Sequence, residues 1–549
     1  MTNFKSIQDE IIELTALEVA NKIRSREWSA RQVMESILES AKQAQISTNS
    51  IVLLKDQEAL EASERLDKDI EAGINFPESE YPFLGVPLSV KDYLHVAGWP
   101  TWAGYRKVGK VNQLEDAALV TILKKLGCIP YCKTNVPQLG ASTECDNPVF
   151  GTTKNPYNAE FTSGGSCGGE AALIGSQGSI LGIGSDYGGS LRVPASFCGV
   201  YSFKPTSGRF PTAGHFPIMS GQDSIATVTG PLGKSVDDIA AMFKYVAQSE
   251  PWKLDSECSK INYEPFELPK DRKYKIGYVV SNKLFPSTPA CERAVLETVK
   301  LLRDQGHEGH EVFEYNLPGS SEAYQLCGTI LISDGLKNAT RFMSSSEPYT
   351  AIIKQLVTTL RIPNFIKTSL QYILSNVFGQ TTFSDLLTFS ILPDVAKLWN
   401  YQERKNVLAK EALEAWIKTG EEDGHQMDVL ICPVSISPPQ KHNTFIAISP
   451  SLWPCMIFNL YNYPSAVIPV TKVDDDLDRM GDVDQWLREK LPKNYEGGTW
   501  GQKNCYSFYD SKQMAGLPIG VQIVGKKFSD EKVLEFMKYI DGLIKDSKK

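Results

Sequence analysis

The chain has 549 residues, of which 42% are hydrophobic and 22% charged, the composition of an ordinary globular protein. Its formal net charge of −8 argues against nucleic acid or an anionic membrane as the main partner, because both bind basic surfaces. Eleven cysteines in so long a chain favour a reducing compartment over a disulfide framework. The N-terminus lacks an apolar signal core and no uncharged stretch suits a membrane span, so we expect a cytoplasmic protein.

The first 80 residues are predicted to form helices. Thr15 with Glu18, and Ser29 with Gln32, have the spacing of capping boxes, in which each side chain bonds the backbone N–H of the other residue. The apolar residues after the second box repeat at helical spacing and share one face: Val33, Ile37, Leu38 and Ala41. We therefore expect amphipathic helices at this end of the chain.

Beyond residue 80, short apolar segments typical of buried strands alternate with helical segments. A strand is expected within residues 83–92, then a helix from about Asp116 to Gly127, then a strand at 128–133. The alternation recurs later, with strands expected at 274–280, 310–318, 427–434, 464–471 and 517–525, and with helices that end near Leu302 and begin at Ser529. This interleaving predicts an α/β protein with a mostly buried sheet.

One segment, from Ser163 to Arg192, stands apart because it holds ten glycines and six serines. Glycine at this density indicates that the backbone makes close contacts that a Cβ atom would obstruct. A phosphate-binding loop is disfavoured. Gly182 and Gly184 are followed by Gly188 one residue too late for the dinucleotide pattern, and no P-loop pattern is present.

Two catalytic interpretations of this segment stay open on the residues alone. Ser166 lies in a G-x-S-x-G sequence and would be the nucleophile of an α/β-hydrolase if His425 or His442 supplied the later histidine. Alternatively, serines of the segment act with Lys91, which ends an apolar strand-like run beside Asp92. Burial favours the neutral form of a lysine amine, and a neutral amine can act as a general base.

Taken together, the motifs resemble one family, the amidase signature hydrolases. The resemblance rests on GVPLSVKD at 85–92, KTNVPQLG at 133–140, SGGSCGGEAALI at 163–174, GIGSDYGGSLRVPASFCGVYSFKPTSGR at 182–209 and TGPLGKSVDDIAAM at 229–242. The N-terminal TALEVANKIRSREWSARQV and the overall length are most similar to the fungal acetamidase branch of general amidases. The resemblance implies one domain over 1–549, with a central mixed β-sheet covered by helices, a helical segment at 1–80 and a catalytic core at 80–245.

In that family the catalytic set is Ser–cis-Ser–Lys, without a histidine. Carried over motif by motif, the resemblance makes Ser190 the nucleophile, Ser166 the bridging serine on a cis peptide bond, and Lys91 the base. It also implies an oxyanion hole made by backbone N–H groups of one turn: Tyr187, Gly188, Gly189 and Ser190.

Supporting roles are expected for further residues of the segment. Asp186 and Arg192 are expected to hold the turn by an ion pair, and Ser163 is expected to line the site. The chain departs from the usual GGSSGG motif at Cys167, which replaces the second serine and leaves the catalytic set intact. A thiol is a weaker hydrogen-bonding group than a hydroxyl. We interpret the aromatic-rich residues 340–400 as an insertion near the substrate site, packed rather than bound to a membrane, because few basic residues flank it.

We therefore expect an enzyme that hydrolyses a carboxylic acid amide, such as acetamide or another small monocarboxylic amide, to the acid and ammonia through an acyl-enzyme on Ser190. Two alternatives are an amidotransferase-type subunit that releases ammonia from glutamine for a partner, and a fatty-acid-amide-type hydrolase. The expected partner is the small-molecule amide, without nucleic acid or a stable membrane span, and a homodimer is left open.

No cofactor and no metal are expected for this chemistry. His307 and His310 lack further ligands at metal spacing. Trp99 and Trp102 are candidates both for the wall of the substrate pocket and for the core.

Overall fold

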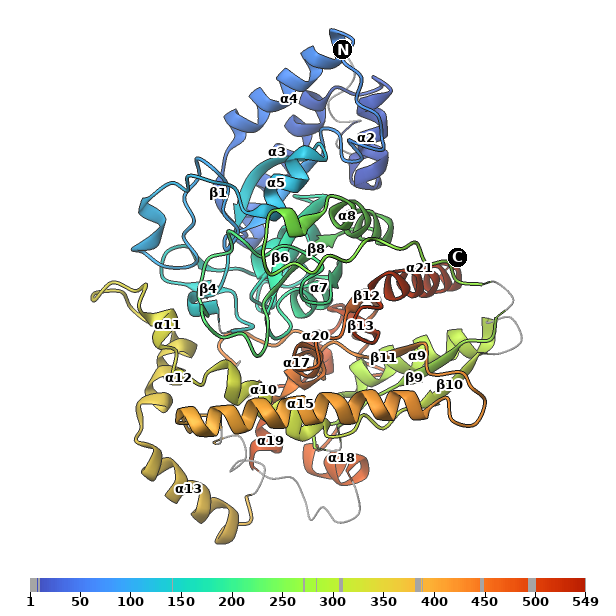
Figure 1. The fold of residues 1–549 in the computed structure, drawn as a ribbon. Coiled ribbons are helices and arrows are strands. Elements are labelled where there is room, and N and C mark those ends of the chain that lie inside the picture. Colours follow the sequence, from blue (N-terminus) through green and yellow to red (C-terminus); the bar gives the residue numbers. More distant parts are fainter. Residues whose placement is uncertain are drawn as a thin grey trace.

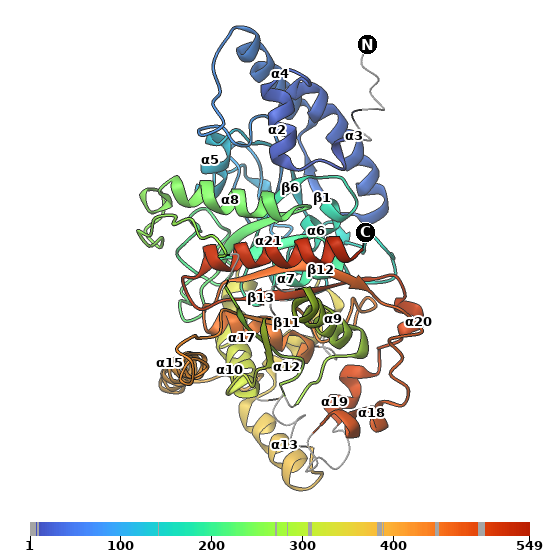
Figure 2. The ribbon, with the colours of Figure 1, turned by 90° about the vertical axis from the view of Figure 1, so that its right-hand side faces the viewer.

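In the computed structural model, one mixed β-sheet crosses the molecule and helices cover it (Figure 1, Figure 2). The structure describes residues 7, 10–140, 142–269, 272–282, 284–305, 310–380, 387, 389–444, 449–491 and 500–548. Within this described part, eleven strands form the sheet in the order β1-β3-β2-β6-β8-β7-β12-β13-β11-β9-β10.

The strands of the sheet come from both ends of the chain. Their bounds are β1 (Ile51–Leu54), β2 (Pro87–Lys91), β3 (Ile129–Thr134), β6 (Leu181–Asp186), β7 (Tyr201–Lys204), β8 (Val228–Gly233), β9 (Lys275–Tyr278), β10 (Glu311–Glu314), β11 (Val429–Pro433), β12 (Ser465–Lys472) and β13 (Pro518–Val524). β2 is parallel to β3 and β6, and β9 is parallel to β10 and β11. The pairs that join β6 to β11 through the centre are antiparallel. A separate pair consists of β4 (Asp146–Asn147) and β5 (Gly151–Thr152).

The helices divide between the two ends of the molecule and the layers beside the sheet (Figure 1). Their bounds are α2 (Ala16–Arg24), α3 (Ala30–Thr48), α4 (Asp56–Glu71), α5 (Ala118–Lys125), α6 (Gly168–Gly175), α7 (Arg192–Cys198), α8 (Val236–Gln248), α9 (Pro289–Gln305), α10 (Ser320–Leu331), α11 (Lys337–Thr340), α12 (Ala351–Arg361), α13 (Asn364–Asn376), α15 (Val395–Lys418), α17 (Trp453–Leu460), α18 (Val483–Lys490), α19 (Trp500–Tyr506), α20 (Ser511–Met514) and α21 (Asp530–Ser547). Figure 2 shows α8, α9 and α21 in front of the strands. Together they contact β7, β8 and β10 to β13, and α21 also contacts α8 and α9. α7 packs against β7, β12 and β13.

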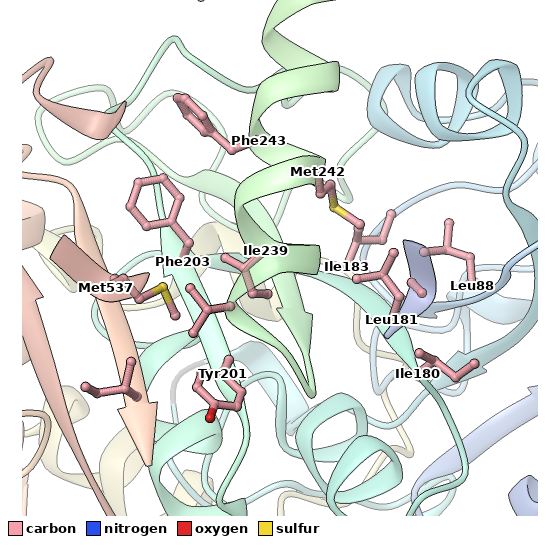
Figure 3. Packing of buried hydrophobic residues seen from close by; sticks show 14 of the residues in the cluster. Leu88, Ile180, Leu181, Ile183, Tyr201, Phe203, Ile239, Met242, Phe243 and Met537 are labelled. Atoms are coloured by element: carbon pink, nitrogen blue, oxygen red, sulfur yellow. The ribbon is translucent and has the colours of Figure 1, made fainter. Parts of the chain in front are cut away.

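The layer of helices is held to the sheet by large apolar side chains. Figure 3 shows Ile239, Met242 and Phe243 of α8 directed toward Phe203 of β7 and Ile183 of β6. The rings of Phe203 and Phe243 meet edge to face, with their centroids 5.4 Å apart. All five side chains are fully buried, and burial of such side chains is the main term that stabilises a fold of this kind.

The predicted α/β architecture and the expected central mixed sheet are confirmed. Both capping boxes, Thr15 with Glu18 and Ser29 with Gln32, form at the starts of α2 and α3. Each strand expected from an apolar run is present within a few residues of its expected bounds. The prediction missed β1, β6, β7 and β8; β6 has the sequence LGIGSD, whose glycines hide the apolar pattern of a strand.

At the end of the molecule opposite the N-terminal helices lies α13, and α12 precedes it nearer the middle (Figure 1). α12 presents Ile352, Ile353 and Val357 to the interior. α13 exposes several large apolar side chains to solvent: Phe365, Ile366, Leu370, Tyr372 and Ile373. Among the helices in the described ranges, none is both long enough and apolar enough to cross a membrane.

Candidate active site

Two parallel strands bring Lys91 and Ser185 to the same place. β2 ends at Lys91 and β6 ends at Asp186, and the strands pair with Val90 opposite Ile183. Because the carboxyl ends of parallel neighbours meet at one edge of a sheet, the Lys91 side chain emerges beside the last residues of β6. The glycine-rich segment leaves the sheet at this edge.

The Lys91 side chain is fully buried and contacts three oxygen atoms. Its Nζ lies 2.7 Å from Ser166 Oγ, 3.0 Å from Ser185 O and 3.1 Å from Ser185 Oγ. The centroid of the Tyr93 ring lies 4.9 Å from the same nitrogen. The amine is therefore held by neutral oxygens and shielded from water.

Ser166 lies on the loop that leads into α6. The peptide bond between Gly165 and Ser166 is cis, as expected, and α6 begins two residues later. Ser166 is buried, and its hydroxyl contacts Lys91. Cys167 N donates to Ser190 O at 3.2 Å, which joins this loop to the turn that carries Ser190.

That turn is braced by a buried carboxylate. Asp186 accepts hydrogen bonds from Gly189 N at 2.8 Å and Leu191 N at 3.0 Å, and it forms the expected ion pair with Arg192 at 3.1 Å. Burial alone would raise the pKa of Asp186, but the Arg192 guanidinium holds that pKa well below its usual range. The carboxylate is therefore ionised while it holds the turn.

The brace continues into the C-terminal part of the chain. Asn459 of α17 donates to Asp186 at 2.8 Å. Arg192 donates to Gln522 Oε1 of β13 and to Cys455 O, each at 3.1 Å. The turn at Ser190 is thus fixed by residues more than 250 positions away in sequence.

The backbone N–H groups of the turn differ in their partners. Gly189 N–H is donated to Asp186, whereas those of Tyr187, Gly188 and Ser190 have no acceptor among the described residues. Gly189 has a φ of +124°, and a Cβ there would lie 2.9 Å from the Cβ of Cys455, so the position requires glycine.

Cys167, which replaces the usual second serine, keeps a hydrogen bond at its position. Its Sγ lies 3.2 Å from Ser185 O and donates to it. Burial raises the pKa of the Cys167 thiol, so the sulfur retains its proton for this bond. The thiol therefore joins the Ser166 loop to β6.

A cavity of about 670 Å³ opens onto the turn. Ser190, Gly188, Tyr187 and Gly165 lie at its wall. Most of the remaining wall is apolar and comes largely from α10, α12, α17 and the segments between them, with residues such as Leu331, Ile352, Leu356, Phe389 and Met456, and Met219 joins it from the segment between β7 and β8. The site therefore joins a buried serine and lysine to a large apolar chamber.

Comparison with known proteins identifies the chain. A family model described as Amidase matches residues 32–534. The chain belongs to the amidase signature family. Enzymes of this family hydrolyse amide C–N bonds, and the match covers both the glycine-rich segment and the strands around it.

Individual amidases resemble the chain over most of its length. Fatty acid amide hydrolase 1 of Caenorhabditis elegans is 32% identical over 468 residues, which cover 84% of this chain and 76% of that protein. The acetamidase of Emericella nidulans is 29% identical over 545 residues, 97% of this chain and 90% of that protein. A solved fatty acid amide hydrolase matches the chain with a TM-score of 0.83 at 24% identity. The match covers 98% of this chain and 86% of that protein, and it shows that the two share a fold.

The histidines proposed for an α/β-hydrolase have no hydrogen bond to Ser166 or Ser190 among the described contacts. His425 is exposed in the turn before β11. His442 contacts the buried Glu144 through Nδ1 and Ala159 O through Nε2, at 3.1 Å for the latter. Ser166 instead contacts Lys91, so the arrangement agrees with the lysine interpretation.

Several other residues from the sequence analysis take structural positions. His310 contacts the Tyr539 hydroxyl at 2.8 Å, and His307 lies outside the described residues. No cluster of three or more His, Cys, Asp or Glu side chains suited to a metal occurs in the described part of the chain. Trp99 donates to Glu58 at 2.7 Å, and neither it nor Trp102 is part of the cavity wall. Ser163 is fully buried and likewise is not part of that wall.

Sequence reasoning missed some residues at the site. Gln222 donates to the Tyr187 hydroxyl and orients this side chain at the cavity. His215 Nε2 lies 2.9 Å from Ser185 Oγ, next to Lys91. Neither residue belongs to a motif, because each reaches the site from a loop whose path the sequence pattern does not reveal.

Proposed function

We propose that this amidase hydrolyses a carboxylic acid amide through an acyl-enzyme on Ser190, with Ser166 as proton bridge and Lys91 as base. The observation that carries the proposal is the 2.7 Å contact between Lys91 Nζ and Ser166 Oγ, beside a turn that presents Ser190 to a cavity. A serine hydroxyl is a weak nucleophile and needs a proton acceptor. A hydroxyl such as that of Ser166 can accept one proton while it donates another.

The proton and bond changes balance along this path. Ser190 Oγ attacks the carbonyl carbon as its proton passes to Ser166 Oγ, and the Ser166 proton passes to the Lys91 amine. When the C–N bond breaks, the same path returns a proton to the leaving nitrogen, which departs as ammonia or an amine. Water then attacks the ester on Ser190 and gives its proton to the path. The bond between Ser190 Oγ and the acyl carbon breaks, the path returns that proton to Ser190 Oγ, and the acid is released.

Negative charge on the carbonyl oxygen needs donors already in place. We assign this role to the N–H groups of Tyr187, Gly188 and Ser190, which the described residues leave without acceptors. The N–H of Gly189, the fourth donor expected from the sequence, is occupied by Asp186 and holds the turn instead. Removal of one such donor typically costs about 10²–10³-fold in rate.

The cavity favours a long apolar acyl group over acetamide. Its volume of about 670 Å³ lies in the range of about 300–1,000 Å³ that is usual for drug-sized ligands, far more than acetamide fills. Apolar side chains such as Leu331, Ile352 and Met456 would bury the acyl chain, and each buried CH₂ contributes about 0.8 kcal/mol. Residues of 340–400 contribute to this wall, which supports the interpretation of that segment as an insertion near the substrate site.

The test is ammonia release from a series of primary amides, from acetamide to dodecanamide, and from glutamine. We expect kcat/KM to rise with chain length and Ser190→Ala to abolish turnover of every amide. Turnover that persists in Ser190→Ala would overturn the nucleophile assignment. A preference for glutamine would favour the amidotransferase-type subunit, and a preference for acetamide would restore the small-amide expectation.

A further inference from the structure

Lys91 can act as a base only if its lone pair points at Ser166. A neutral amine has two N–H donors and one lone pair, and Lys91 Nζ has three oxygen neighbours. One neighbour, Ser185 O, is a carbonyl oxygen and can only accept. The lone pair is therefore aimed at Ser166 only when the third neighbour, Ser185 Oγ, also accepts from Lys91.

A hydroxyl that accepts from Lys91 must donate its own proton elsewhere. The Ser185 hydroxyl has one further close partner among the described residues, His215 Nε2 at 2.9 Å. If the Ser185 proton turned back toward Lys91 instead, it would compete with the Ser166 proton for the lone pair. The partner of Ser185 thus decides which hydroxyl the base can deprotonate.

We infer that His215 is a positioning residue that accepts the Ser185 proton and so keeps the Lys91 lone pair directed at Ser166. This inference rests on the proposed function of Lys91 as base. The same arrangement serves both protonation states of Lys91, because a protonated amine donates to all three oxygens and Ser185 still donates to His215. The proton can therefore move without a rotation of the Ser185 hydroxyl.

The surroundings of His215 keep its ring neutral, as an acceptor must be. Burial of the ring, together with the positive charge of Lys91, lowers the pKa of His215 to about 3. Tyr93 packs edge-on against the ring, with centroids 5.6 Å apart. His95, whose Nδ1 contacts Thr101 Oγ1 at 2.9 Å, is the other titratable group that acts on it.

Two variants of His215, whose side-chain amides differ in length by one methylene group, test the inference. The amide of His215→Gln reaches the position of Nε2 and offers an acceptor there, whereas the shorter amide of His215→Asn does not reach Ser185. We expect His215→Asn to lower kcat for octanamide about 10- to 100-fold, part of the 10²–10⁴-fold that general base catalysis typically contributes. The kcat of His215→Gln should stay within about threefold of that of the wild type. KM should change little in both variants, because residue 215 does not touch the substrate.

Further variants separate positioning from stability. Ser185→Ala removes the intervening hydroxyl, so the double variant Ser185→Ala/His215→Asn should be no slower than Ser185→Ala alone. His310→Asn is the matched control, because that histidine also contacts a hydroxyl, of Tyr539 at 2.8 Å, but far from Lys91. It should change the melting temperature without a change in kcat.

The outcomes distinguish failure of the role of His215 from failure of the proposed function. Equal kcat in His215→Asn and His215→Gln, or additive losses in the double variant, would overturn the role of His215. Wild-type kcat in His215→Asn, with Ser190→Ala inactive, would overturn the inference and leave the proposed function intact. Activity in Ser190→Ala would instead overturn the proposed function.

Discussion

At the scale of single residues, the described partners of Lys91 do not include a carboxylate. Asp92, its neighbour in sequence, forms an ion pair with Lys133 at 3.0 Å, and both side chains are buried. Glu170, beneath the site, accepts from Ser89 and Thr134, and burial raises the pKa of Glu170 to about 7. Neither carboxylate forms an ion pair with Lys91 in the described structure.

Gly188 provides a direct test of the cavity at the same scale. A Cβ at this position would lie 3.6 Å from Leu331 and 3.8 Å from Met456, ordinary contact distances, but it would project into the cavity beside Ser190. Gly188→Ala should therefore fold with an unchanged melting temperature and lower kcat/KM for octanamide more than for acetamide. Equal loss for both amides would show that the methyl group disturbs the turn rather than the acyl site.

At the scale of elements, His442 joins two loops at the cavity. His442 Nδ1 contacts the buried Glu144, and Asn443 N donates to the same carboxylate at 2.9 Å. The neighbours on each side, Thr143 and Asn443, belong to the cavity wall. Burial lowers the pKa of His442, but the contact with Glu144 outweighs this and raises it above the ordinary value.

The raised pKa of His442 decides how the stability of the protein changes with pH. Because the folded pKa of His442 is raised, its ion pair stabilises the protein fully below the ordinary histidine pKa of about 6.5 and is lost as the pH rises through the folded pKa. The melting temperature of the wild type should exceed that of His442→Gln at pH 6, and the difference should shrink toward pH 9. Asp146 and the pair Lys441–Glu160 lie nearby and are common to both proteins. A difference that is constant with pH would contradict the assignment.

At the scale of the whole molecule, α21 ties the two halves of the sheet together. It contacts α8 and α9 as well as β12 and β13. Tyr201 of β7 donates to Asp541 of α21 at 2.7 Å, and Arg209 forms an ion pair with Glu531 of the same helix at 2.5 Å. We therefore expect the C-terminal helix to unfold together with the strands of the sheet.

This unity predicts a single unfolding transition. Met537→Ala removes a fully buried side chain between α21 and the sheet (Figure 3), so it should lower the free energy of unfolding by about 2–5 kcal/mol. The loss should appear as one transition, coincident in circular dichroism and in remaining activity, with kcat unchanged at low temperature. The surface control Lys538→Ala should stay within about 0.5 kcal/mol of the wild type. Two separate transitions would contradict a single unit.

How far the sequence predicts this molecule differs from one feature to another. Apolar runs such as that of β2 predict strands because burial on both faces leaves a simple pattern, whereas β6 is concealed by its glycines. Lys91 and the two serines could be proposed from motifs, since each motif keeps its residues close together in sequence. His215 could not be predicted, because it belongs to no motif and its contact with Ser185 depends on a loop with no pattern of its own.

The brace of the Ser190 turn has a consequence for the order in which the enzyme is made. Asp186 accepts a hydrogen bond from Asn459 of α17, and Arg192 donates one to Gln522 of β13. A ribosome adds these partners only after most of the chain has been synthesised. Ser190 and Lys91 are thus present early in translation, but we expect the turn to remain unassembled until the last strand of the sheet has emerged, so that a truncated chain would carry the motifs of an amidase without its activity.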